Sequence, residues 1–172
     1  QLESADVLLM QLETPVQTIA YAASIAKESG KTVILNPAPA QTLPDRLLAQ
    51  LDVITPNETE AEILTGIKVE TADDAEQAAR VLRDKGVGVV IITMGSRGAF
   101  VLSDSFVAVV PAPTVDAVDT TAAGDTFNGA LAVGLANGDR LEDAVAFANR
   151  AAAISVTRLG AQSSTPRLEE LE

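Results

Sequence analysis

Asp125 stands at the start of an apolar segment, inside the run DTTAAGDTFNG. The small residues Ala122, Ala123 and Gly124 allow a ligand to approach the backbone, and the apolar residues after them predict a buried helix over about 124–136. The first N–H groups of a helix, with the positive end of its dipole, bind phosphate. Asp125 could accept a hydroxyl proton beside a phosphate held there. The run therefore predicts a phosphoryl-transfer site with Asp125 as base and Ala122, Ala123 and Gly124 as anion hole.

A structural interpretation of the same residues stays open. Asp125 could cap the helix, because acidic residues are favoured at helix starts, and the small residues could serve tight packing. For an isolated Gly-Asp pair this would be the stronger interpretation.

The elements that must position this run follow a regular order. Apolar strands alternate with helices, which predicts a parallel sheet. We expect strands at 7–10, 32–35, 52–55 and 89–93, with intervening helices that include about 44–50 and 72–85. A pair of strands around Ser103, Asp104 and Ser105, within 98–110, predicts an antiparallel edge. Two long helices are expected last, at about 124–136 and 141–156.

The first helix has clear boundary signals. Thr14, Pro15 and Gln17 predict a capping hydroxyl, a first-turn proline and a capping-box glutamine. Gly30 is expected to end the helix.

The composition excludes several kinds of chemistry. The 172 residues, 47% hydrophobic and 21% charged, fit one compact domain or a large part of one. The chain has no cysteine and no histidine, which excludes disulfides, Ser-His-Asp hydrolysis and the commonest transition-metal sites. No apolar stretch reaches the roughly 20 residues of a membrane span. We expect a soluble, cytoplasmic protein with no membrane partner.

The charge balance limits the partners. The net charge of −12 and the pI near 4.3 disfavour nucleic acid, which is attracted by clustered Lys and Arg. An anionic substrate would need local help, which helix termini and a magnesium ion can supply.

The segment TMGSRG, residues 93–98, lies at the carboxyl end of a predicted parallel strand, where ligands of open α/β sheets bind. A glycine-containing turn between two strands explains the same letters equally well. Neither a P-loop nor a Gly-x-Gly-x-x-Gly fingerprint occurs, so a phosphate ligand would need another device.

Three further acidic or amide side chains follow predicted strands. Asn57 and Glu60 could be an ordinary helix start, or hard oxygen ligands for magnesium. Glu13 could be a solvated loop carboxylate or an acceptor for sugar hydroxyls.

Together these segments resemble the ribokinase (PfkB) family of carbohydrate kinases. The run DTTAAGDTFNG resembles the C-terminal signature of that family, and Asn57-x-x-Glu60 resembles its Asn-x-x-Glu motif. The segments LMQLETP, residues 9–15, and NPAPA, residues 36–40, are typical of ribokinases. The resemblance extends over residues 1–172 as one kinase domain, but only as its C-terminal portion. It implies a three-layer α/β/α fold with a mostly parallel central sheet, without the N-terminal part and the β lid.

The resemblance also implies roles for single residues. Glu13 and Asp125 would bind the sugar, and Asn57 and Glu60 would hold magnesium through water. The implied nucleotide contacts are Asn57, Thr93, Met94, Gly95, Ser96, Arg97, Gly98, Gly124, Asp125 and Asn149. The implied positions around a monovalent cation such as potassium are Asp119, Thr121, Ser155, Arg158, Gly160 and Ser164.

The implied activity is phosphorylation of D-ribose to D-ribose 5-phosphate with ATP, Mg²⁺ and K⁺, in a homodimer formed through the missing lid. The alternatives are another sugar or nucleoside kinase of the family, because sugar choice lies mainly in the missing portion, or an inactive nucleotide-binding fragment. The start at Gln1, just before a buried strand, favours a fragment. Unpaired strand edges near Val7 would promote aggregation.

Overall fold

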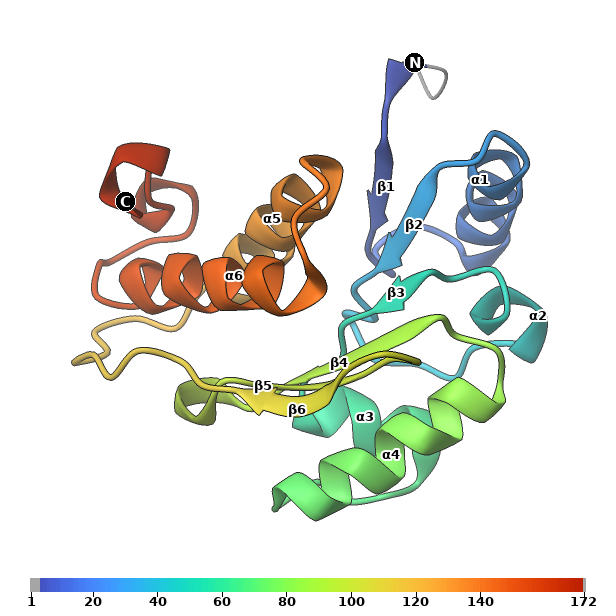
Figure 1. Cartoon of the computed structure of the whole chain (residues 1–172), viewed down its shortest axis with the longest axis horizontal. Coiled ribbons are helices and arrows are strands. Elements are labelled where there is room, and N and C mark those ends of the chain that lie inside the picture. The colour runs from blue at the N-terminus through green and yellow to red at the C-terminus, as the bar shows by residue number, and fades with distance from the viewer. Residues whose placement is uncertain (1–3, 172) are drawn as a thin grey trace. The chain divides into compact units, whose positions relative to one another are not determined.

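The structure is a computed structural model that describes residues 4–171 (Figure 1). The chain divides into two compact units. Unit 1 comprises the residues up to Met94 together with Phe100–Val109, and unit 2 comprises Gly95–Ala99 and the residues from Val110 onward.

Unit 1 is built on a sheet whose strands lie in numerical order, as Figure 1 shows. The strands are β1 (Val7–Met10), β2 (Thr32–Leu35), β3 (Val53–Ile54), β4 (Val89–Thr93), β5 (Ala99–Leu102) and β6 (Val107–Val110). Strands β1 to β4 pair in parallel. The short connection between β5 and β6 makes them a hairpin at the edge, because parallel neighbours need a long crossover. The predicted mostly parallel α/β fold is therefore confirmed.

The helices of unit 1 follow the strands along the chain. They are α1 (Val16–Glu28), α2 (Asp45–Leu48), α3 (Glu58–Thr65) and α4 (Ala72–Asp84). One apolar core joins them to alternate strand residues such as Val33, Leu35 and Ile92. Ile34 and Ile91, which point to the opposite face, are also fully buried. Burial on both faces explains why these strands are apolar without alternation.

The predicted start of α1 is wrong by one residue. Pro15, not Thr14, occupies the cap position, and no side chain caps this helix within the described chain. The Pro15 carbonyl accepts the N–H groups of Thr18 and Ile19 at 2.8 and 3.2 Å. Proline with its φ near −54° is already suited to lead into the helix, so the main chain closes the first turn without a capping box. The predicted end is confirmed, since Gly30 adopts φ +68° just after α1.

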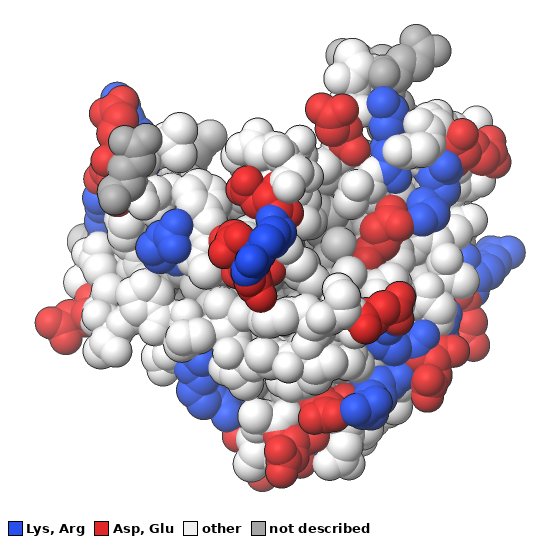
Figure 2. Space-filling view, viewed as in Figure 1, with Lys and Arg blue, Asp and Glu red and all other residues white. Residues whose placement is uncertain are grey.

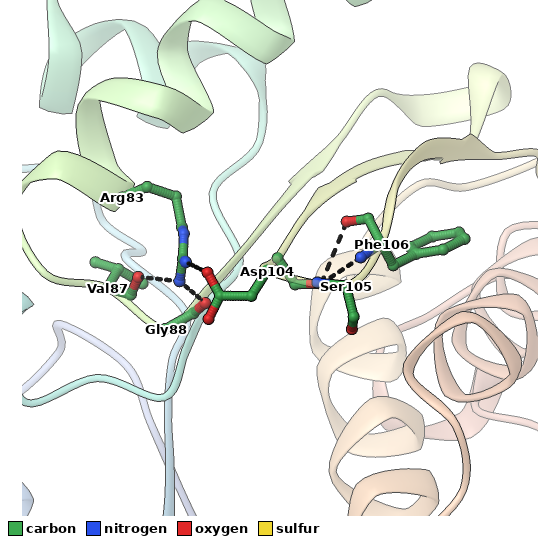
Figure 3. Close-up of polar contacts among 7 residues, drawn as sticks. Arg83, Val87, Gly88, Asp104, Ser105 and Phe106 are labelled. Carbon is green, nitrogen blue, oxygen red and sulfur yellow. Dashed lines mark hydrogen bonds and ion pairs between the residues drawn. The ribbon is translucent and has the colours of Figure 1, made fainter.

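The β5–β6 hairpin is fastened at its turn, as Figure 3 shows. The Ser103 hydroxyl accepts the N–H of Phe106 at 2.9 Å, which closes the turn. Asp104 pairs with the Arg83 guanidinium from α4, which also donates to the carbonyls of Val87 and Gly88. The Arg83 side chain thus ties the end of α4 to the start of β4 and to the hairpin.

Unit 2 centres on two helices that pack against each other, α5 (Ala123–Ala136) and α6 (Leu141–Ser155). Gly134 allows their close approach, because a Cβ there would lie 2.9 Å from the Ala144 Cβ. Short 3₁₀ helices lie at Gly95–Arg97, Gln162–Ser164 and Leu168–Glu170.

Charged side chains are interspersed on the molecular face drawn in Figure 2. Lys and Arg lie among Asp and Glu on that face and do not form one basic area. Within residues 4–171, no helix combines the length and the apolar character that crossing a bilayer requires.

Candidate active site

The start of α5 has an unusual backbone. Ala122, in the cap position, adopts φ +59° and is the only non-glycine residue with positive φ among the described residues. This left-handed conformation costs an L-residue about 1–2 kcal/mol, and such strain is concentrated at functional sites. Within the described chain no side chain caps α5, and the space beside Gly124 is open within 4 Å. The three residues of the predicted anion hole, Ala122, Ala123 and Gly124, therefore form the start of α5, where the Ala123 N–H donates to the Thr120 carbonyl at 3.3 Å.

Asp125 lies in the first turn of α5 and is exposed. The next residues turn inward: Thr126 and Phe127 are 6% and 3% exposed. Asn128, also buried, donates its side-chain N–H to the Gly124 carbonyl at 2.8 Å, which fixes the first turn. The buried face of α5 thus holds the helix while Asp125 faces outward.

A groove of about 590 Å³ runs along the same face of unit 2. Asp125, Thr126 and Gly129 contribute to its wall from α5, and Phe147 contributes from α6. The groove is otherwise largely apolar. A carboxylate on the wall of such a groove is the usual arrangement of a small-molecule site.

Asp119 connects the segment before α5 to the loop after α6. Its carboxylate accepts the N–H of Thr121 at 2.9 Å and the N–H of Gly160 at 3.0 Å. The Thr121 hydroxyl also donates a hydrogen bond to this carboxylate. This bond and the two N–H groups together lower the pKa of Asp119 from 3.8 to about 2. The structure therefore brings Gly160, 41 residues further along the chain, to the ionised Asp119 carboxylate that also accepts the Thr121 N–H.

The other residues assigned to the cation lie at the end of α6 and in the segment that follows it. Ser155 and Ser164 are fully buried, and their hydroxyls donate to the carbonyls of Ala152 and Ala161 at 2.8 and 2.7 Å. The Arg158 guanidinium pairs with Glu170. Since a guanidinium cannot ligate a cation, only the main-chain oxygen of Arg158 could serve there.

We expect Asp119→Asn to destabilise the chain at neutral pH, with a smaller difference in acid. The folded-state pKa is depressed, so the carboxylate contributes fully above about pH 4 and loses this contribution as the pH falls to about 2. Melting temperatures of the wild type and the variant at pH 7, 4 and 2.5 measure this. Asp116→Asn, an exposed position in the same segment, should leave melting unchanged. A constant difference between wild type and Asp119→Asn would contradict the prediction.

The segment 95–98 depends on two glycines. Gly95 and Gly98 adopt φ +57° and +92°. A Cβ at Gly98 would lie 2.1 Å from the Val110 carbonyl oxygen, so only glycine fits there. Asn149 reaches the same backbone, donating to the carbonyls of Val110 and Pro111 at 2.9 and 3.3 Å. The structure thus joins Gly98 and Asn149, two predicted nucleotide residues, through Val110.

The sequence did not indicate that Val110 and Pro111 link these two residues. Their main-chain carbonyls accept the hydrogen bonds, and every residue type has such a carbonyl. Asn149 itself is 5% exposed, and its amide N–H groups serve this contact. Ser96 and Arg97 are exposed within the same turn.

In unit 1, Asn57 and Glu60 form a capping box at the start of α3. The Asn57 Oδ1 accepts the Glu60 N–H at 2.8 Å, and the Glu60 carboxylate accepts the Asn57 N–H at 2.9 Å. Burial raises the pKa of Glu60, and the Asn57 N–H opposes this rise. Asn57 also bridges to Thr93, whose N–H donates to the Pro56 carbonyl at 2.9 Å. The motif therefore has a structural role, and it lies beside Thr93 and the buried Met94.

We expect Asn57→Ala to cost about 1 kcal/mol of unfolding free energy, because the capped N–H of Glu60 loses its acceptor. Asn57→Asp keeps an acceptor and should retain wild-type stability. Urea unfolding followed by circular dichroism measures both variants. Equal losses in the two would show that capping is not the cause.

Glu13 follows β1 and is exposed. The preceding Leu12 donates its N–H to the Ala38 carbonyl at 2.7 Å, which places the Glu13 segment beside the segment at 36–40. The two stretches singled out in the sequence therefore meet. Among the described residues, no cluster of three acidic side chains suited to a metal ion occurs.

Comparison with known proteins identifies the family to which the chain is similar. The family model of the pfkB family carbohydrate kinase matches residues 1–168. The chain is 51% identical over 170 residues to the ribokinase of Haemophilus influenzae, a match that covers 99% of this chain and 56% of that protein. It is 42% identical over 170 residues to the deoxyribokinase of Salmonella typhi, with 98% and 56% covered.

Solved structures agree. The ribokinase of Thermotoga maritima matches with a TM-score of 0.90 at 44% identity, covering 99% of this chain and 56% of that one. The Arabidopsis thaliana ribokinase complexed with ribose and ATP matches with a TM-score of 0.92 at 33% identity, covering 99% and 55%. The chain thus spans little more than half the length of these relatives. With residues 1–168 matched, the chain belongs to the pfkB family of carbohydrate kinases.

Proposed function

We propose that this chain carries the catalytic base and nucleotide-binding part of a ribokinase, which transfers the γ-phosphoryl group of ATP to the 5-hydroxyl of D-ribose. The observation that carries the proposal is the start of α5, where exposed Asp125 lies beside an open helix N-terminus and on the wall of a groove. The 51% identity to a ribokinase over 99% of the chain supports ribose as the sugar.

In this mechanism Asp125 accepts the proton of the sugar hydroxyl as the oxygen attacks phosphorus. The backbone at Gly124 and Asp125 stabilises the negative charge on the phosphoryl oxygens, since helix N-termini favour anions, while the Ala123 N–H donates to the Thr120 carbonyl at 3.3 Å. The first turn is already fixed by Asn128, so these donors need little reorganisation when the ligand binds.

Nucleotide contacts are proposed for the segment 93–98, for Gly124 and for Asn149. Because the amide N–H groups of Asn149 are engaged with Val110 and Pro111, its contribution would come through the backbone that it orders. Glu13 is proposed to accept sugar hydroxyls. Pairing of two such proteins through a lid stays a prediction.

The residues present fit the two metal ions of the proposal. Asn57 and Glu60 offer hard oxygen ligands. Two protein side chains are enough for magnesium, because this ion keeps water and phosphate oxygens as its other ligands. Magnesium held there would neutralise phosphate charge. Asp119, ionised through its depressed pKa, fits a monovalent cation that Thr121, Ser155, Arg158, Gly160 and Ser164 would surround with main-chain and hydroxyl oxygens. Such an ion would order the loop beside the anion hole.

A second candidate is phosphorylation of deoxyribose, favoured by the 42% identity to a deoxyribokinase. More generally, another sugar or a nucleoside could be the acceptor, or the isolated chain could bind nucleotide without catalysis.

The test is ADP release by the folded chain with MgATP and KCl, comparing D-ribose, 2-deoxyribose, fructose and no sugar. A chimera that adds the N-terminal part of the Haemophilus influenzae ribokinase is assayed in parallel, because the chain spans 56% of that protein. Ribose-dependent release by either protein supports the proposal. Release that is independent of sugar, or absent from a folded chimera, would contradict it.

A further inference from the structure

The C-terminal tail, residues 165–171, contacts the loop that follows α6, residues 156–160, through the Glu170 carboxylate. Both terminal nitrogens of the Arg158 guanidinium donate hydrogen bonds to the Glu170 carboxylate, and the longer of the two is 3.3 Å. The same carboxylate accepts the Arg167 N–H at 2.8 Å. These contacts lower the pKa of Glu170 to about 2. The carboxylate is thus held by a two-pronged ion pair and by the backbone of its own turn.

The tail also reaches the start of α5. The hydroxyls of Thr126 and Thr165 lie 3.4 Å apart, and Pro166, Leu168 and Leu171 line the groove that Asp125 faces. The tail is therefore attached to the helix that carries the base and to the loop that carries the cation positions.

The Arg158–Glu170 contact bears on the loop backbone that carries the proposed cation ligands. The loop backbone between Ser155 and Gly160 is fixed on one side by the Gly160 N–H on Asp119. Arg158 fixes the same backbone nearer to Ser155. The Arg158 N–H donates to the Ser155 carbonyl at 3.2 Å, and the Arg158 side chain pairs with Glu170. Removing Glu170 would free the guanidinium, and the Arg158 carbonyl would lose its fixed direction.

We infer that Glu170 is a positioning residue, which holds the Arg158 side chain so that the carbonyls of Arg158 and Gly160 are oriented toward a monovalent cation. This inference rests on the cation site of the proposed function. It adds Glu170, which the sequence patterns did not single out, to the residues that determine cation affinity.

The experiment measures cation affinity without catalysis. Thermal unfolding of the chain is followed by circular dichroism while KCl replaces choline chloride at constant ionic strength, so that general screening does not change. A cation that binds only the folded chain raises the melting temperature as its concentration increases. The quantity compared between variants is the KCl concentration that produces a chosen rise in melting temperature. The variants are Glu170→Gln and Glu169→Gln; the latter removes the same charge one residue earlier, from an exposed side chain.

We expect Glu170→Gln to need about three- to fivefold more KCl than the wild type for the same rise in melting temperature. A change of this size is typical of losing a partly exposed ion pair. Glu169→Gln should follow the wild type. The exchanged pair Arg158→Glu with Glu170→Arg should recover part of the affinity. If Glu170→Gln does not fold, Glu170→Asp, which keeps the charge but shortens the side chain, gives the same comparison.

A KCl response of Glu170→Gln identical to the wild type would overturn the inference, even if its melting temperature were lower throughout, because the contact would then be only structural. A wild type that responds equally to KCl and choline chloride would overturn both this inference and the proposed cation site. That outcome differs from failure of the proposed phosphoryl transfer, which the ADP assay reports separately.

Discussion

Asp125→Asn is expected to lower ribose-dependent ADP release by at least about a hundredfold, the usual contribution of a general base. The amide is similar in shape to the carboxylate but cannot take the hydroxyl proton, so positioning survives while proton transfer is lost. Binding of a non-hydrolysable ATP analogue, measured by calorimetry, should change little. The assay uses whichever protein, chain or chimera, shows ribose-dependent release.

Asp73→Asn is the matched control, since Asp73 is also an exposed aspartate in the first turn of a helix, α4. It should retain full turnover. Release by Asp125→Asn within a few fold of the wild type would remove Asp125 from the role of base. Equal loss in both variants would point to a general effect of first-turn charge on stability.

Gly98→Ala is expected to cost at least about 4 kcal/mol, among the largest effects of a single substitution. The added Cβ would lie 2.1 Å from the Val110 oxygen and 2.7 Å from the Ala112 nitrogen, in a backbone with φ +92°. All of the opposing atoms are main chain, so no side chain can move aside. Melting should fall by about 10 °C or more, because each kcal/mol is worth about 2–4 °C in a chain of this size.

Gly95→Ala separates close approach from backbone conformation. Gly95 also has positive φ, +57°, but a Cβ added there would meet no other atom within 4 Å. It should therefore cost only the left-handed conformation, about 1–2 kcal/mol. Equal melting temperatures for the two variants would show that the contact with Val110 is unimportant.

The sequence predicted the sheet and its helices well, because these depend on local apolar patterns. Strands at 7–10, 32–35 and 89–93 are confirmed within their stated bounds, and the two long helices, Ala123–Ala136 and Leu141–Ser155, differ from the predicted bounds by one residue each. The predicted start of α1 was wrong because Thr14 and Gln17 carry a capping signal that the main chain of Pro15 replaces. Such competition between side-chain and main-chain acceptors is decided by geometry that the sequence does not record.

The candidate site divides in the same way. The resemblance selected Asp119 and Gly160, and the structure places them in contact. The Arg158–Glu170 pair and the path from Gly98 through Val110 to Asn149 had no counterpart in the sequence analysis. Each depends on a tertiary contact between a side chain or Cβ and a distant segment, and no spacing rule predicts these.

The helix start at Ala122 has a consequence for the conditions under which such a site works. Its positive potential comes from peptide N–H groups, which do not titrate in the pH range where proteins are folded, whereas a lysine can be deprotonated or acetylated. The attraction for an anion there is thus permanent. Any pH dependence of phosphate binding at this helix would follow the ionisation of the ligand itself, near pH 6 for a phosphate monoester.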